Sequence, residues 1–179
     1  MTNTSQLLFI SLGFGFSLCV CAWVFFRVSG GLFNPAVSLG LALVGAISPV
    51  RAGILVFAQL LGGMAGAAII QVLLPGPLYV NTTLSGGISV AQGAHPRTPA
   101  SLDTRRADPT ARSFPSGLFL EMFLTALLML TILLLAAEKH KATYLAPVGI
   151  GLSLFIAEMT GVYWTGGSLN PVRTLLGSC

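Results

Sequence analysis

Two short stretches of the chain place an asparagine before a proline in the same local pattern. Residues 29–40 read SGGLFNPAVSLG and residues 165–176 read TGGSLNPVRTLL. Asparagine is a strong helix N-cap and proline is favoured at the first helical position, so each Asn-Pro pair predicts a helix start. The asparagine amide and the free backbone N–H groups of such a start are hydrogen-bond donors. This chemistry holds a neutral oxygen and repels cations, and it makes or breaks no covalent bond.

The composition shows what kind of molecule holds these motifs. Of the 179 residues, 54% are hydrophobic and 8% are charged, whereas a soluble domain has about 25% charged residues. The mean hydropathy is +0.87, so too little polar surface exists to cover a water-soluble globule. The net charge of +4 comes from loop residues without interleaved aromatics, and we expect no nucleic-acid partner. Because the cysteines form neither a disulfide framework nor a CxxC pair, we expect no metal and no cofactor.

Four stretches are apolar enough to cross a bilayer, which takes about 20 residues. They are residues 7–26, 52–74, 116–137 and 144–164. Between the second and third spans, the proline-rich residues 75–115 predict a solvated outer loop, which contains a glycosylation sequon at Asn81. The chain is therefore predicted to be an integral, multi-pass, all-α membrane protein with one domain over residues 1–179.

The segments 29–48 and 165–179 are also apolar, but glycine and proline interrupt them and they are too short to cross. Three spans separate the two Asn-Pro pairs, so the two copies enter the membrane from opposite sides as an inverted repeat. We predict two re-entrant half-helices that meet at the midplane, with both asparagine amides facing one central point. The alternative, a capped helix start between two spans, would be favoured for one copy but not for two. Small residues spaced by four, Gly13 with Ser17 and Gly62 with Gly66, predict close helix approach.

The two Asn-Pro stretches resemble the paired Asn-Pro-Ala boxes of the aquaporin, or major intrinsic protein, family. The resemblance extends through FGFS at 14–17, AQLLGG at 58–63, FLEMFLT at 119–125 and LAPVGIGLSL at 145–154. The loop stretch LPGPLYVNTTLSGGISVAQG resembles filamentous-fungal members. The family implies a passive channel for water or small neutral solutes, a homotetramer in the lipid bilayer of the plasma membrane or an internal membrane, and no enzymatic activity. It also implies that residues 29–50 enter from the cytoplasmic side, which the evenly spread basic residues do not decide.

The resemblance also implies roles for single residues. The pore boxes are Asn34, Pro35 and Ala36, and Asn170, Pro171 and Val172, with valine in place of the family's alanine. The outer selectivity filter corresponds to Phe14, Glu158, Gly167 and Arg173. Loop support is expected from Glu121, which would hold the backbone of the second re-entrant loop, and from Gln59 in the second span. Thr174 follows the filter arginine where glycerol-conducting members place an aspartate, which favours water.

Glu158 departs from the family, whose water-selective members commonly hold a histidine at this position. It could pair with Arg173 and neutralise the positive charge of the filter. It could instead point between helices and accept hydrogen bonds from the loop backbone. An intramembrane arginine is costly unless it lines a pore, and we expect Arg173 to exclude protons and cations by its charge.

The family has six spans, and equivalents of its first and sixth spans are absent from this pattern. We therefore expect little or no water conduction from this chain alone. Two alternatives stay open: a non-conducting structural or regulatory subunit of an intact aquaporin, and a glycerol facilitator. A coupled transporter would show more polar ion ligands in its spans. An intramembrane enzyme would need a nucleophile with a base or a metal cluster, and no predicted span contains a histidine.

Overall fold

The computed structural model describes residues 4–74, 114–138, 141 and 143–176. Within these ranges every regular element is a helix. The elements are α1 (Thr4–Phe25), α2 (Pro35–Leu43), α3 (Pro49–Leu73), α4 (Phe114–Ile132) with its π-helical end Leu133–Ala137, a 3₁₀ turn Thr143–Leu145, α5 (Ala146–Thr165) and α6 (Pro171–Leu176). Most of the predicted outer loop, with the sequon at Asn81, and the last residues of the chain lie outside the described residues.

Four helices are long and apolar enough to cross a membrane, which confirms the predicted class of all-α, multi-pass membrane protein. They cover Thr4–Phe25, Pro49–Leu73, Gly117–Ala137 and Thr143–Thr165. The second span starts three residues earlier than the hydropathy pattern predicts, because Ser48 caps it and its hydroxyl accepts a hydrogen bond from the backbone N–H of Arg51. A proline at the first position stabilises this start.

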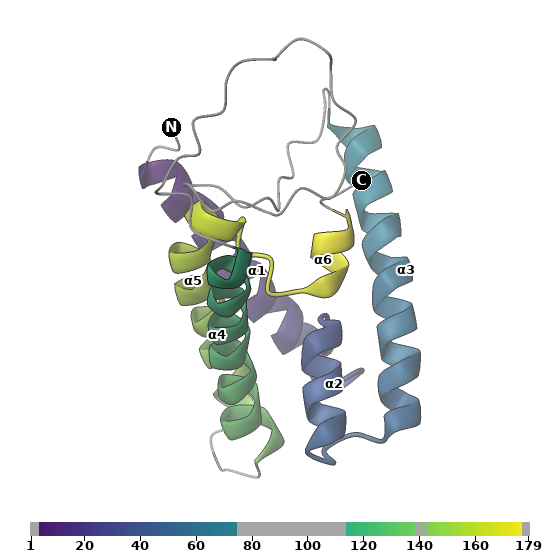
Figure 1. Cartoon of the computed structure of the whole chain (residues 1–179). Coiled ribbons are helices and arrows are strands. Elements are labelled where there is room, and N and C mark those ends of the chain that lie inside the picture. Colours follow the sequence, from purple (N-terminus) through teal and green to yellow (C-terminus); the bar gives the residue numbers. More distant parts are fainter. Residues whose placement is uncertain (1–3, 75–113, 139–140, 142, 177–179) are drawn as a thin grey trace, which may run out of the picture.

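The two half-helices lie end to end between the longer helices (Figure 1). α2 has nine residues and α6 has six within the described part, and neither is long enough to cross a bilayer. Both pack beside α3, while α1 and α4 pack on α5 on the other side of the half-helices. The fold thus places the starts of α2 and α6 in the interior of the molecule.

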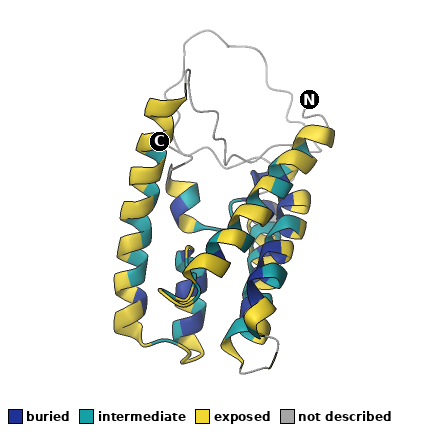
Figure 2. Ribbon diagram, turned by 180° about the vertical axis from the view of Figure 1, so that it is seen from behind, coloured by how far each residue is buried: buried dark blue, intermediate teal, exposed yellow. Residues whose placement is uncertain are grey.

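A small apolar core joins α2 and the loop before α6 to α4 and α5. Its buried members are Val37, Leu41, Leu124, Leu128, Ile132, Ala146, Ile150, Ala157 and Leu169. Figure 2 shows the buried residues along the inner faces of these helices, whereas α3 is exposed along most of its surface. An exposed apolar helix surface is expected where lipid is the solvent.

Close helix approach occurs at the crossing of α1 and α5, not at the pairs predicted from sequence. A Cβ added to Gly15 would lie 2.9 Å from the carbonyl oxygen of Gly151, so both glycines are needed there. A Cβ at Gly13, Gly62 or Gly66 would meet no described atom within 4 Å. The small-residue prediction was therefore wrong for these three positions, because spacing does not say which helix face meets a neighbour.

Candidate functional site

The two asparagines of the repeated motif meet at the centre of the fold. The amide nitrogen of Asn34 donates to the carbonyl oxygen of Leu169 at 2.7 Å. In the same way, the amide nitrogen of Asn170 donates to the carbonyl oxygen of Phe33 at 3.0 Å. Each asparagine therefore holds the residue that precedes the other asparagine. Because an amide nitrogen carries two hydrogens, each side chain keeps a second N–H beyond this bond.

Each asparagine also caps its own half-helix. The side-chain oxygen of Asn34 accepts a hydrogen bond from Ala36 N at 2.9 Å, and that of Asn170 accepts one from Val172 N at 3.0 Å. The two caps have matching geometry, so the valine of the second box leaves the cap intact. Pro35 and Pro171 begin the two half-helices, as their fixed φ favours.

Glu121 lies on α4 against the loop that leads into α6. Its Oε1 accepts hydrogen bonds from the hydroxyl of Thr165 and from Ser168 N at 3.1 Å, and its Oε2 accepts one from Leu169 N at 2.9 Å. Leu169 has a positive φ of 47°, which is unusual for a residue other than glycine. Its backbone N–H is held by Glu121 and its carbonyl by Asn34, so the surroundings enforce the strained conformation.

Gln59 makes the corresponding contacts on the other half of the fold. Its side-chain nitrogen donates to the carbonyl oxygen of Leu32 at 3.0 Å and to the hydroxyl of Ser38 at 2.9 Å. The hydroxyl of Ser38 in turn donates to the carbonyl oxygen of Asn34. The side chain of Gln59 thus ties α3 to the first re-entrant loop and to the first turn of α2.

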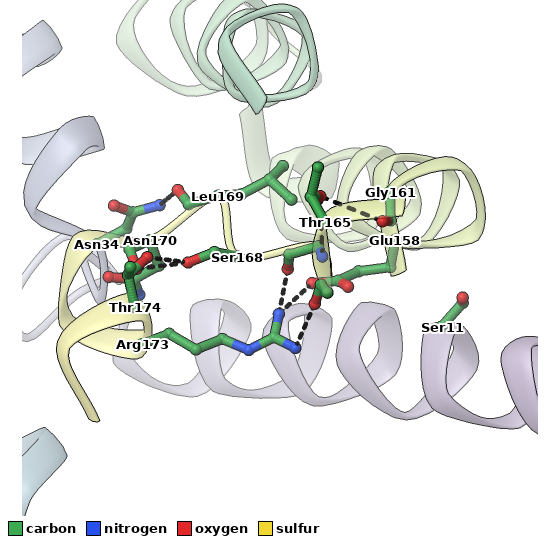
Figure 3. A network of polar contacts seen from close by, with 12 residues as sticks. Ser11, Asn34, Glu158, Gly161, Thr165, Ser168, Leu169, Asn170, Arg173 and Thr174 are labelled. Carbon is green, nitrogen blue, oxygen red and sulfur yellow. Dashed lines mark hydrogen bonds and ion pairs between the residues drawn. The ribbon is translucent and has the colours of Figure 1, made fainter. Parts of the chain in front are cut away.

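The structure brings together the four residues that the resemblance assigns to the filter, and Figure 3 shows Glu158 paired with Arg173. Arg173 lies with its guanidinium carbon 3.9 Å from the centre of the Phe14 ring and its Nη1 2.8 Å from Oε1 of Glu158. The same guanidinium donates to the carbonyl oxygens of Gly167 and of Gly166, the latter at 3.0 Å. Of the two roles that the sequence leaves open for Glu158, this geometry is the pairing with Arg173.

Gly167 provides the space in which the Glu158 carboxylate lies. A Cβ added to Gly167 would collide with Oε2 of Glu158 and would lie 3.1 Å from a methyl group of Val162. The φ of Gly167 is +57°, a conformation that favours glycine. Oε2 is buried and has no hydrogen-bond partner among the described residues. The carboxylate is therefore held through one oxygen, by the arginine.

A cavity of about 410 Å³ extends from the asparagine pair to the predicted filter residues. Its lining includes Asn34 and Asn170 at the start of the half-helices, Phe14 and Arg173 of the predicted filter, and Arg51 near the start of α3. Arg51 is a lining residue that the sequence alone does not single out, and its Nη2 donates to the carbonyl oxygen of Ser29 at 3.2 Å. The sequence signal that could have identified Arg51 is its position in the first turn of a span, close to the capping Ser48.

The described residues do not form a metal centre. No group of three or more His, Cys, Asp or Glu side chains comes together within the described ranges. The acidic side chains inside the spans, Glu121 and Glu158, are instead bonded to backbone N–H groups, a hydroxyl and a guanidinium. The polar side chains along the cavity therefore form a set of hydrogen-bond donors and acceptors that their neighbours hold in place.

Comparison with known proteins agrees with this architecture. The family model for Major intrinsic protein matches residues 1–178. The chain is 55% identical over 173 residues to "Aquaporin-7" of Botryotinia fuckeliana, covering 97% of this chain and 33% of that protein. It is 50% identical over 177 residues to "Probable aquaporin-5" of Gibberella zeae (99% and 28%) and 47% identical over 172 residues to "Aquaporin-1" of Laccaria bicolor (96% and 48%). The chain thus spans less than half the length of these curated relatives, and it belongs to the major intrinsic protein family.

Proposed function

We propose that this chain forms a passive membrane pore for water, with the asparagine pair at its narrow centre. The observation that carries the proposal is the reciprocal bonding of Asn34 and Asn170 beside the cavity that both side chains line. Each amide uses one N–H in this bonding and keeps a second one for a passing oxygen. A water molecule can accept such a bond without covalent change and move on.

The same centre is unfavourable for cations. The N-terminus of the nine-residue α2 carries a partial positive charge. A cation that leaves water needs oxygen acceptors, and the amides of Asn34 and Asn170 present donors instead because their oxygens are engaged in the two helix caps. The desolvation cost of the cation then has no compensating contact. Water passes and cations are excluded by the same groups.

We propose that Phe14, Glu158, Gly167 and Arg173 form the outer filter of this pore. Their mutual contacts and their place along the cavity support this assignment. Thr174, which follows Arg173, supports water as the main solute over glycerol. The names of the relatives, all aquaporins, support the same function.

We further propose that the exposed apolar helix surfaces face lipid and neighbouring copies in a homotetramer.

One observation leads us to propose a conducting chain, in place of the little or no conduction that the sequence alone predicts and in place of a non-conducting subunit. The cavity reaches from Arg51, near the start of α3, past both asparagines to Arg173 in α6. A purely structural subunit would have no need of a cavity that is lined by the donors of both repeats. The half-helices would then be expected to pack against each other without such a space.

The proposal is tested by osmotic shrinkage of vesicles that contain the 179-residue chain. With an impermeant osmolyte, we expect faster shrinkage than in empty vesicles of the same lipid. With glycerol as the osmolyte, we expect the vesicles to shrink and to re-swell no faster than empty ones. Shrinkage at the empty-vesicle rate would support the non-conducting alternative, and rapid re-swelling would identify a glycerol facilitator.

A further inference from the structure

We propose that Glu158 excludes anions from the pore by cancelling the attraction of Arg173 for them. This inference rests on the proposed function and adds a determinant of specificity to it. Glu158 is a positioning and charge-compensating residue, because its own side chain is only 1% exposed. Its effect on a solute is exerted through the arginine, whose side chain is 21% exposed.

The charges around the cavity determine which ions it would attract. Three charged residues line the cavity within the described part of the chain: Arg51, Glu158 and Arg173. The uncharged polar groups at its centre are the amide donors of Asn34 and Asn170, beside the positive end of α2. Without Glu158, the charged side chains that line the cavity within the described residues would both be positive, and the two amide donors would lie beside them. Such a cavity is a site for anions.

The carboxylate of Glu158 is fixed against the guanidinium of Arg173. Oε1 of Glu158 lies 2.8 Å from Nη1 of Arg173. The other described contacts of the guanidinium are two backbone carbonyls and the face of the Phe14 ring. Glu158 therefore supplies the only full negative charge that the described residues place in contact with this arginine. Two opposite charges this close form a dipole, whose field falls off faster with distance than that of a single charge.

A charge-compensating role and a merely structural role of Glu158 predict different ion permeabilities. A structural role, in which Glu158 only holds the arginine in place, predicts that neutral replacements reduce water flux and leave ion selectivity unchanged. A charge-compensating role predicts a new permeability for anions, because the amide donors at the centre offset part of the cost of removing an anion from water. The ratio of anion to water permeability distinguishes the two roles, since a loss of folded protein lowers both permeabilities together.

The experiment measures nitrate influx and osmotic water flux in vesicles that contain the wild-type chain, Glu158→Gln, Glu158→Asp or the double variant Glu158→Gln/Arg173→Gln. We expect Glu158→Gln to raise the nitrate-to-water permeability ratio by about tenfold or more. The reason is that the charge of Arg173 is then no longer cancelled, and it attracts an anion strongly in a narrow site that holds little water. Glu158→Asp keeps the negative charge and should keep the wild-type ratio. The double variant removes both charges and should return the ratio to near the wild-type value.

A binding measurement makes the test independent of flux. In detergent, nitrate should raise the Tm of Glu158→Gln by binding to the unpaired arginine, and it should leave the Tm of the wild type unchanged. If Glu158→Gln does not fold, Glu158→His at pH 8, where histidine is neutral, is the second variant and the expectation is the same. Equal nitrate responses of the wild type and the neutral variants in both assays would overturn the inference. A wild-type chain that passes no water would instead contradict the proposed function, while the Tm comparison would still decide the role of Glu158.

Discussion

The side chain of Asn34 donates a hydrogen bond to the backbone carbonyl of Leu169 at 2.7 Å, although the two residues are 135 positions apart in the sequence. Leu169 has a positive φ of 47° and is held from its other side by Glu121. The bond therefore connects a helix cap in the first repeat to a strained turn in the second. The position of each half-helix consequently depends on the other repeat.

Replacing Asn34 by alanine should destabilise the fold more than the loss of an ordinary helix cap. Asn34→Ala removes the cap of α2, which is worth about 1 kcal/mol, and leaves the buried carbonyl of Leu169 without its donor, which costs about 1–3 kcal/mol. We expect a loss of roughly 2–4 kcal/mol in the free energy of unfolding in detergent. Ser48→Ala is the matched control, because Ser48 caps α3 and its side chain makes no bond to the other repeat among the described residues. Equal losses for the two variants would contradict the cross-repeat role of Asn34.

Glu121→Gln should weaken the second re-entrant loop. The carboxylate accepts three hydrogen bonds from the loop with its two oxygens, and a glutamine would turn a donor toward one of those donors. We expect a loss of about 1–3 kcal/mol in unfolding free energy, because a buried N–H loses its acceptor. Glu138→Gln, at the exposed end of the same span, serves as the control and should be close to neutral. A thermal unfolding curve of each variant makes the comparison, and coincident curves would refute the support role.

Gly167→Ala should displace the Glu158 carboxylate and break its pairing with Arg173. The added methyl group would collide with the carboxylate, and the backbone φ of +57° disfavours any L side chain. We expect roughly 1–3 kcal/mol of destabilisation. The control is Gly62→Ala on α3, where the added Cβ meets no described atom within 4 Å. That variant should be neutral or stabilising by up to about 1 kcal/mol, because alanine favours a helix more than glycine does. The measurement is the free energy of unfolding of the two variants under the same conditions. A Gly167→Ala variant as stable as the wild type would contradict the close packing of Gly167 against Glu158.

Arg173→Val should raise proton and cation leak through the pore. The substitution leaves the carboxylate of Glu158 without its partner, so the filter changes from a compensated pair to a single acidic group that attracts cations. The leak can be followed with a pH-sensitive dye in vesicles under a potassium gradient. Arg51→Gln, a variant of another arginine along the cavity, should leave the leak lower than Arg173→Val does. Unchanged leak together with intact water flux would show that Arg173 has no role in ion selectivity.

The sequence predicts the spans and the half-helices well, because both depend on local information. Hydropathy over about 20 residues locates a span, and an Asn-Pro pair specifies a helix start through its own side chain and backbone. The meeting of Asn34 and Asn170 could also be predicted, since three intervening spans invert the second copy. The start of α3 was misplaced by three residues because hydropathy does not register a serine cap.

The remaining features depend on contacts between distant segments, and the sequence does not specify them. The orientation of Glu158 toward Arg173 depends on the space that Gly167 provides beside α5. The positive φ of Leu169 depends on Glu121 and Asn34 together. Close helix approach needed Gly15 and Gly151, which lie on facing helices. Ser11 and Gly15 have the same four-residue spacing as Gly13 and Ser17, so spacing alone does not identify the face that packs. Such pairings are visible only once the helices are placed.

The temperature dependence of water permeability tests the central proposal, a water-filled path past Asn34 and Asn170, most directly. Water in such a path exchanges hydrogen bonds with fixed donors and is never transferred into hydrocarbon, so its barrier is low. Vesicles with the 179-residue chain should shrink faster than empty vesicles, and their rate should rise less steeply with temperature. The same rate and the same steep temperature dependence as empty vesicles would contradict the proposed pore.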